Sequence, residues 1–178
     1  MTSAFIALGA NLGDAAAAFK QAVMLIDRLP LTQVRRVSSV YLTAPLDTDA
    51  GREALAPGAD YLNAVAEVQT GHGALELLSD LQRIETDAGR ERTLRNAPRL
   101  LDLDLLLFGD ERLDSEHLTL PHPRMLQRAF VLVPLAEIAP DKVTAAQLAA
   151  VAHQPIKLLG NLGELVNLRA PLRAQDVG

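Results

Sequence analysis

The feature that most constrains the fold is an apolar run in the second half of the chain that two acidic residues interrupt. Residues 101–108 read Leu-Asp-Leu-Asp-Leu-Leu-Leu-Phe. In a β-strand successive side chains point to opposite faces, so Asp102 and Asp104 would share one face. On a helix the two carboxylates would lie about 200° apart and could not converge. The run therefore predicts a strand with one core face and one face that carries two carboxylates. The residues expected to face the core are Leu101, Leu103, Leu105 and Leu107.

Around this run, strand and helix patterns alternate along the chain. The predicted strands lie at residues 4–8, 32–43, 61–69 and 101–108. The predicted helices are the segment after Asp14, the segment that contains Leu77, Leu78, Leu81 and Ile84, and residues 128–138 and 144–153. In the first helix the apolar spacing of i, i+3, i+4 and i+7 starts at Phe19. This order favours an α+β sandwich of the ferredoxin-like βαββαβ kind with additional C-terminal helices.

Composition limits the classes of function. A chain of 178 residues is expected to form one domain, here residues 1–165, with a poorly ordered tail at 166–178. There are no cysteines, which excludes disulfides and thiolate chemistry. The net charge of −5 disfavours nucleic acid as the main partner. The chain has no apolar run of about 18 residues and no basic leader. We therefore expect a cytoplasmic monomer that binds no membrane.

The paired aspartates predict a metal site. Two neighbouring carboxylates repel each other unless a cation lies between them. Mg²⁺ is the natural cation, because it binds one or two carboxylates while phosphate oxygens and water complete its octahedron. The alternative is that Asp102 and Asp104 are simply hydrated on an edge strand.

Arginines gather just before the aspartates. The chain has fourteen arginines and three lysines, and Arg90, Arg92, Arg95 and Arg99 fall within ten residues. Arginine binds phosphate in bidentate geometry, so these arginines predict a loop that binds a polyphosphate. His122 and Arg128 add further donors. The alternative is a solvated run of charge. The other histidines, interpreted as structural, are His72, His117 and His153.

Two residues on the strand 61–69 suit a flat heterocycle. Tyr61 and Asn63 share a strand face, where an aromatic ring can stack and an amide can read the ring edge. The alternative is a half-buried tyrosine beside a hydrogen-bonded asparagine. Residues 9–14, Gly-Ala-Asn-Leu-Gly-Asp, form a strand-to-helix turn, but they lack the Gly-Lys-Ser/Thr ending of a P-loop.

Four ordered motifs together resemble the 6-hydroxymethyl-7,8-dihydropterin pyrophosphokinase family of folate biosynthesis. The most specific stretch is Pro-Arg-Leu-Leu-Asp-Leu-Asp-Leu-Leu-Leu-Phe-Gly at residues 98–109. The others are residues 9–14, Tyr-Leu-Asn at 61–63 and Pro-His-Pro-Arg-Met at 121–125. The resemblance extends from about Ala4 to Pro140.

The resemblance implies a reaction and a set of site residues. Members of this family move the β,γ-pyrophosphoryl group of ATP onto the pterin hydroxymethyl oxygen and release AMP. Asp102 and Asp104 would hold two Mg²⁺ ions, and the expected catalytic groups are these two with Arg90, Arg92 and Arg99. The implied ATP contacts are Gln82, Glu85, Arg90, Arg92, Arg99, His122 and Arg128. The implied pterin contacts are Thr43, Leu46, Tyr61, Asn63 and Phe130, and segments 44–59 and 90–99 would be lids.

The chain also departs from the common family pattern. Asn96 and Ala97 stand where many members have Trp-Gly, so the lid is expected to close differently. Leu100, Pro123 and Ala44 replace residues that are often Thr, Tyr and Pro. Two other functions stay open on the residues alone. A metal-dependent phosphohydrolase would explain the aspartates and arginines, and a ligand-binding ferredoxin-like domain would explain the fold.

Overall fold

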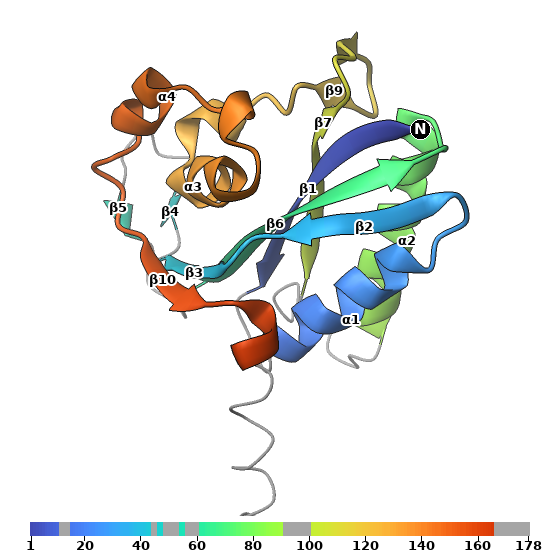
Figure 1. Ribbon diagram of the computed structural model, residues 1–178, viewed down its shortest axis with the longest axis horizontal. Coiled ribbons are helices and arrows are strands. Elements are labelled where there is room, and N and C mark those ends of the chain that lie inside the picture. The colour runs from blue at the N-terminus through green and yellow to red at the C-terminus, as the bar shows by residue number, and fades with distance from the viewer. Residues whose placement is uncertain (11–14, 44–45, 48–53, 56–60, 91–100, 166–178) are drawn as a thin grey trace, which may run out of the picture.

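A mixed α+β fold is built on one antiparallel sheet. The computed structural model describes residues 1–10, 15–43, 46–47, 54–55, 61–90 and 101–165. The main strands are β1 (Thr2–Ala10), β2 (Thr32–Val37), β3 (Val40–Thr43), β6 (Tyr61–Thr70), β7 (Asp102–Phe108) and β10 (Lys157–Gly160). Their order is β10-β3-β6-β1-β7, and β2 also pairs with β6 (Figure 1). All these pairs are antiparallel. Since β7 is the last strand in this order, it lies at an edge of the sheet.

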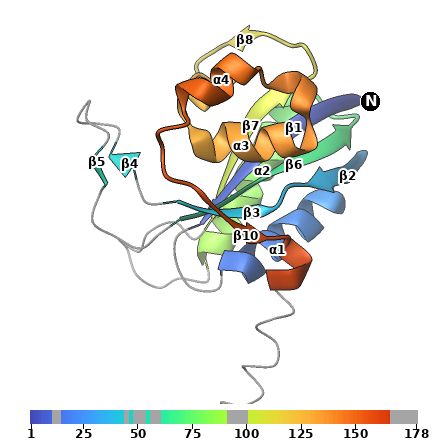
Figure 2. The same cartoon turned by 60° about the vertical axis from the view of Figure 1, so that its left-hand side comes forward.

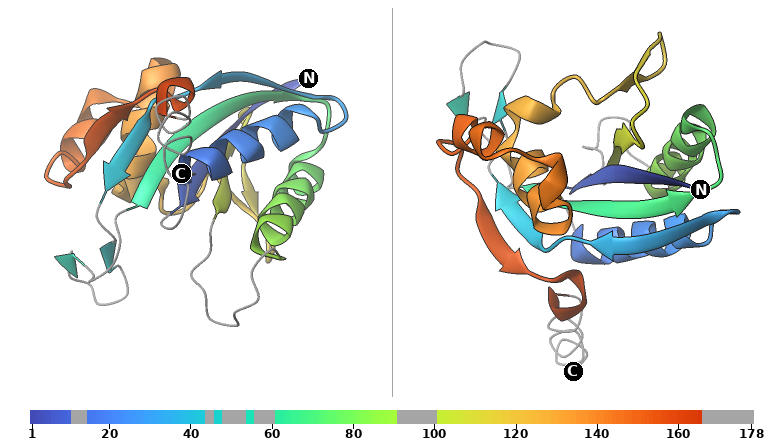
Figure 3. Two further views of the ribbon diagram at one scale, coloured as in Figure 1. Left: turned by 90° about the horizontal axis from the view of Figure 1, so that it is seen from below. Right: turned by 45° about the horizontal axis from the view of Figure 1, so that its top comes forward.

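Helices cover the two faces of the sheet unequally. Helices α1 (Ala15–Asp27) and α2 (Ala74–Arg90) pack on one face, and α3 (Ala129–Ile138) packs on the other (Figures 2 and 3). Alternate residues of β6 supply both cores. Ala64, Ala66 and Val68 belong to the apolar cluster under α1 and α2, whereas Val65 belongs to the cluster under α3. This confirms the strand predicted at residues 61–69.

The strand predicted at 101–108 forms, with one correction. Leu101, Leu103 and Leu105 join the cluster under α1 and α2, as the period of two requires. The pairing of β7 with β1 shifts register between Phe5 and Ile6, and such a bulge inserts one extra residue and reverses the alternation. Leu107 therefore packs against the α3 cluster. Its predicted place on the core face with the other leucines is wrong.

The strand predicted at 32–43 is two strands. β2 ends at Val37 and β3 begins at Val40, and Ser38 between them is hydrogen-bonded to β6. The Ser38 N–H donates to the Val65 carbonyl at 2.8 Å, and the Val65 N–H donates to Ser38 Oγ at 2.9 Å. The sheet thus stays hydrogen-bonded through the break.

The C-terminal part contains helices that the sequence predicts and a strand that it does not. α3 and α4 (Ala145–Ala150) fall within the predicted segments, and Thr144 caps α4 in a capping box with Gln147. β10 follows residue 154, where no element is predicted. It pairs with β3 through backbone hydrogen bonds. Its side chains are mostly exposed, so they carry no pattern that predicts a strand.

The remaining elements are short. They are β4 (Leu46–Asp47) paired with β5 (Ala54–Leu55), β8 (Leu113–Asp114) paired with β9 (Thr119–Leu120), and the 3-10 turns η1 (Met125–Gln127) and η2 (Pro140–Lys142). Among the described residues, no helix is long and apolar enough to span a membrane. The predicted tail at 166–178 lies outside the described residues.

Candidate active site

A cavity of about 200 Å³ opens on the α3 face, where β1, β6 and β7 reach one end of the sheet. Polar residues from separate elements line it together with the backbone of β1. The lining residues are Ala7, Leu8, Gly9, Thr43, Tyr61, Asn63, Asp102, Asp104, Leu106, His122, Arg128, Phe130 and Val131. Eight of the residues that the sequence singles out are therefore brought together: Thr43, Tyr61, Asn63, Asp102, Asp104, His122, Arg128 and Phe130.

One row of residues crosses the sheet beneath this cavity. Gly9 of β1 lies opposite Asp102 of β7 on one side and Asn63 of β6 on the other. Asn63 in turn lies opposite Tyr41 of β3. A Cβ atom at Gly9 would stand 3.7 Å from Asn63 Oδ1 and 4.0 Å from the Asp102 Cβ. The glycine therefore leaves the space between carboxylate and amide open.

The aromatic end of the cavity is held by a buried amide. Asn63 and Thr43 are 6% and 7% exposed, and Asn63 Nδ2 donates to Thr43 Oγ1 at 2.7 Å. This bond fixes the orientation of the amide, because the nitrogen is committed to the neighbouring strand. Tyr61 lies opposite Thr43 in the sheet, and Phe130 enters from α3. The walls are thus two aromatic rings and one oriented amide.

The charged end combines Asp104 with His122 and Arg128. The His122 N–H donates to the Leu106 carbonyl at 2.9 Å, and the Arg124 N–H donates to His122 Nδ1 at 3.2 Å. Burial lowers the pKa of the His122 imidazole. The Asp104 carboxylate opposes that shift, whereas the guanidinium groups of Arg128 and Arg124 reinforce it. A neutral His122 that accepts at Nδ1 carries its proton on Nε2, as a hydrogen-bond donor.

Arg128 stands between the charged end and the aromatic end. Its guanidinium lies 5.4 Å from the centroid of the Phe130 ring, within the range of a cation–π interaction. Burial lowers the pKa of Arg128, and the Asp104 carboxylate opposes the shift because it favours the charged form. The side chain therefore offers one positive charge to an anion and one flat face to the aromatic wall.

A second cavity of about 370 Å³ adjoins the first at the free edge of β7. Its lining residues are Leu78, Gln82, Glu85, Asp102, Leu103, Asp104, Leu105, Ser115, Glu116, His117, Leu118, Thr119, His122 and Pro123. Glu85 Oε1 accepts a hydrogen bond from the Leu103 N–H at 2.5 Å, which ties α2 to the edge strand. Asp102, Asp104 and His122 line both cavities, so the two aspartates stand where the cavities meet.

Some expectations fall outside the described residues. Arg92 and Arg99 do, and so do most of the predicted lids at 44–59 and 90–99. Leu46 lies in β4 and Arg90 ends α2, but their side chains are not described.

Sequence reasoning missed two features of the site. The predicted structural histidine His117 lines the second cavity, next to the β8–β9 hairpin. No strand is predicted there, because two-residue strands carry no periodic signal. The sequence places Gly9 only in a turn, because its position between Asp102 and Asn63 depends on register across three strands.

Comparison with known proteins identifies the family. The family model for 7,8-dihydro-6-hydroxymethylpterin-pyrophosphokinase matches residues 5–140. The chain belongs to this family.

Curated members of the pyrophosphokinase family are similar along most of their length. The Bacillus subtilis enzyme, named 2-amino-4-hydroxy-6-hydroxymethyldihydropteridine pyrophosphokinase, is 39% identical over 87% of this chain and 89% of its own. Enzymes of the same name from Haemophilus influenzae and Pseudomonas aeruginosa are 43% and 44% identical, over 80% and 77% of this chain and 85% and 80% of their own.

A solved structure shares the fold. The wild-type HPPK-DHPS protein of Plasmodium falciparum superposes with a TM-score of 0.59 at 14% identity. The match covers 95% of this chain and 44% of that one, so this chain spans less than half of the larger protein.

Proposed function

We propose that this chain transfers the pyrophosphoryl group of ATP to the hydroxymethyl oxygen of 6-hydroxymethyl-7,8-dihydropterin and releases AMP. Membership of the pyrophosphokinase family supports this reaction. The structural observation that carries it is the meeting of two cavities at Asp102 and Asp104. The first cavity has walls for a flat ring, and the second opens beside both aspartates and His122, where Mg²⁺ would let a polyphosphate bind. A transfer between two such ligands requires this adjacency.

The first cavity is proposed to hold the pterin between Tyr61 and Phe130. A fused heterocycle can stack on both rings, at about 0.5–1.5 kcal/mol for each aromatic contact beyond burial. Because Asn63 Nδ2 is committed to Thr43, Asn63 Oδ1 is the amide atom left to accept from a ring N–H or amino group. The site therefore distinguishes a heterocycle with donors on that edge. Leu46 is proposed to extend this wall.

The second cavity is proposed to hold ATP. Gln82 and Glu85 line its α2 side. The Nε2–H of His122, which lines both cavities, and the guanidinium of Arg128, which lines the first, are proposed as phosphate donors. The arginine loop, with Arg90, Arg92 and Arg99, is proposed to add charge at the triphosphate. Such donors stabilise negative charge that moves between oxygens during transfer.

Two Mg²⁺ ions are proposed at Asp102 and Asp104. Among the described residues no cluster of three or more His, Asp or Glu could enclose a metal. A pair of carboxylates fits Mg²⁺ bound mainly through phosphate and water, which is its usual mode in phosphoryl-transfer sites. When bound, Mg²⁺ would neutralise phosphate charge and acidify the attacking alcohol.

The chain's own residues do the positioning. The hydroxymethyl oxygen, carried by the ring in the first cavity, attacks the β-phosphorus of ATP. A bond forms between that oxygen and the β-phosphorus, and the bond from the β-phosphorus to the oxygen shared with the α-phosphorus breaks. AMP leaves with that oxygen, and the hydroxyl proton passes to solvent. Orientation by Tyr61, Phe130 and Asn63 sets which phosphorus is reached.

The finer fold type belongs to the same proposal. We infer a ferredoxin-like sandwich formed by one domain over residues 1–165. The order β7-β1-β6-β3 with α1 and α2 on a single face supports it, since a βαββαβ chain with two right-handed crossovers produces this arrangement.

Analysis of the nucleotide product tests the reaction. With ATP, Mg²⁺ and hydroxymethyl-dihydropterin, we expect AMP and pterin diphosphate in equal amounts, and no nucleotide cleavage when the pterin or Mg²⁺ is omitted. ADP as the main product would indicate an ordinary kinase. Phosphate release without pterin would indicate the phosphohydrolase alternative. Binding of both ligands without turnover would leave only the ligand-binding domain.

A further inference from the structure

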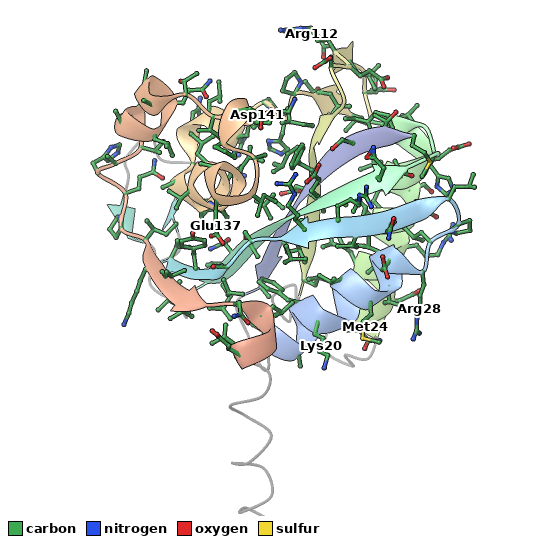
Figure 4. The ribbon with its side chains drawn as sticks, in the orientation of Figure 1. Lys20, Met24, Arg28, Arg112, Glu137 and Asp141 are labelled. Atoms are coloured by element: carbon green, nitrogen blue, oxygen red, sulfur yellow. The ribbon has the colours of Figure 1, made fainter. Side chains whose placement is uncertain are left out.

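Glu137, in the last turn of α3, is tied to the start of β3 by three hydrogen bonds. Its Oε1 accepts from both the N–H and the hydroxyl of Ser39 at 2.8 Å each, and its Oε2 accepts from the Tyr41 hydroxyl. Figure 4 shows Glu137 on the side of α3 that faces the sheet. The residue as a whole is exposed, so burial did not force these contacts. Both carboxylate oxygens are nevertheless committed to one strand.

The same two elements form the aromatic end of the first cavity. Phe130 and Glu137 are seven residues apart on α3, which is nearly two full turns, so both lie on the helix side that faces β3. Tyr41 and Thr43 are two residues apart on β3, so they share a strand face. Glu137 contacts Tyr41 at one level, and Phe130 and Thr43 line the cavity at the next.

Helix α3 has polar contacts at both of its ends and a proline in its interior. Pro134 lies inside the helix and has no N–H, so the Phe130 carbonyl receives no helix hydrogen bond from it. At the N-terminus the Ala129 N–H donates to Gln154 Oε1 at 2.9 Å. At the C-terminus Arg36 Nη1 donates to the Ile138 carbonyl at 2.8 Å, beside the Glu137 contacts. The helix therefore combines apolar packing on the sheet with polar contacts at both ends, and the C-terminal contact is to β2.

We propose that Glu137 is a positioning residue for pterin binding, acting through Ser39 and Tyr41 to set the width of the cavity between Phe130 and β3. Glu137 does not line either cavity, so it touches no substrate. Its carboxylate joins the last turn of α3 to the start of β3, and the Phe130 ring is carried on that helix. The inference rests on the proposed function, in which the pterin stacks on Phe130.

Steady-state kinetics of the full chain test this role. For Glu137→Ala we expect the KM for the pterin to rise about 3- to 10-fold, the scale of one net hydrogen bond, while the KM for ATP changes less than about 2-fold. Tyr41→Phe removes one hydroxyl and should raise the pterin KM in the same direction by less. Glu137→Gln should restore most of the wild-type KM, because its amide can accept from Ser39 and donate to Tyr41.

Asp27→Ala is the matched control. Asp27 ends α1 and its Oδ1 accepts from the Val34 N–H at 2.8 Å, so it is another carboxylate that links a helix end to a strand, on the opposite face. We expect lower stability and an unchanged pterin KM. Equal pterin KM values in wild type, Glu137→Ala and Tyr41→Phe would overturn the positioning role. So would equal rises in both KM values. A wild-type chain that makes no pterin diphosphate would overturn the proposed function itself.

Discussion

The two faces of the sheet use the same strands differently. Under α1 and α2, alternate residues of β6 and β7 are apolar to the end, with Ala64, Leu103 and Leu105 all buried. Under α3, apolar packing at Val65 and Leu106 gives way to Asn63 and Asp102 within a few residues. The candidate site lies beside the first turn of α3, which supplies Phe130 and Val131 to its lining. A period of two thus lets neighbouring positions on one strand serve stability and chemistry separately, and this separation can be tested.

The largest expected effect is at Asp104. Asp104→Ala removes one of the two proposed metal ligands while the phosphate charge remains, so we expect AMP formation to fall at least about 1000-fold, or about 4 kcal/mol of transition-state stabilisation. The metal-free protein should keep its stability or gain slightly as carboxylate repulsion disappears. Product chromatography and urea unfolding measure both. Activity within a few-fold of wild type would contradict the role of Asp104 as a metal ligand.

Leu103, next to Asp104 in the strand, should show the opposite pattern, in which stability is lost more than activity. Leu103 is 3% exposed and packs under α1 and α2. Leu103→Ala should lower the free energy of unfolding by about 2–5 kcal/mol through lost burial and a cavity. Because Leu103 borders the second cavity only with an apolar side chain, the activity of the molecules that remain folded should fall far less than in Asp104→Ala. Urea denaturation combined with kinetics at low temperature gives both values. A Leu103→Ala protein that is stable but inactive would contradict the division between the faces.

Within the site face, the aromatic end should be separable from the charged end. Tyr61→Ala should weaken pterin binding by about 1–3 kcal/mol, the scale of a lost aromatic anchor. Binding of Mg²⁺ and a non-hydrolysable ATP analogue, measured without pterin, should change much less. Calorimetry with each ligand alone makes the comparison. Equal losses for both ligands would indicate a folding defect rather than a separate pterin wall.

The smallest expected effect is a pH dependence at the junction of α3 and β3. Burial raises the pKa of the Glu137 carboxyl, but hydrogen bonds from Tyr41 and Ser39 outweigh it, so the pKa falls below 4.5. A lowered folded-state pKa stabilises the protein above pH 4.5, and that stabilisation is lost as the pH falls through the folded-state value. Glu137→Gln should therefore reduce the acid-induced loss of stability, by less than about 1 kcal/mol because the side chain is exposed.

Titration at alkaline pH gives a second measurement of the contact between Glu137 and Tyr41. Burial, the hydrogen bond to Glu137 and the negative charge of Glu137 raise the pKa of the Tyr41 hydroxyl well above 10.0. The associated stability is present below pH 10.0 and is lost as the pH rises towards the folded-state value. In Glu137→Gln the Tyr41 phenolate should form at lower pH, which ultraviolet absorbance detects. An unchanged titration would show that the two groups are not coupled.

How far the sequence could predict this molecule depends on the kind of information each feature needs. Strand β7 and its paired aspartates follow from the alternation of Asp102, Leu103 and Asp104. The bulge that turns Leu107 to the other face depends on pairing with β1, which no local pattern records. β10 is held by backbone bonds to β3, so its side chains gave no signal.

The same limit applies to the site. The grouping of Tyr61 with Asn63 follows from a shared strand face. Phe130 and Thr43 entered through resemblance to a family, since nothing in their local sequence joins them to a site. The role of Gly9 escaped notice because it consists of a missing side chain. The tie from Glu137 to Tyr41 joins residues 96 positions apart.

The row from Asp102 through Gly9 to Asn63 fixes a distance across the sheet. Adjacent strands are held about 4.8 Å apart by their hydrogen bonds, so the carboxylate and the amide are anchored about 10 Å apart on a backbone that cannot stretch. In the proposed complex, phosphates bound beside Asp102 and a ring edge bound at Asn63 would therefore lie a fixed distance apart. A substrate whose hydroxyl sits one carbon farther from the ring would carry its oxygen past the β-phosphorus. The strand spacing would then select for the length of the group that carries the substrate hydroxyl, without a dedicated side chain.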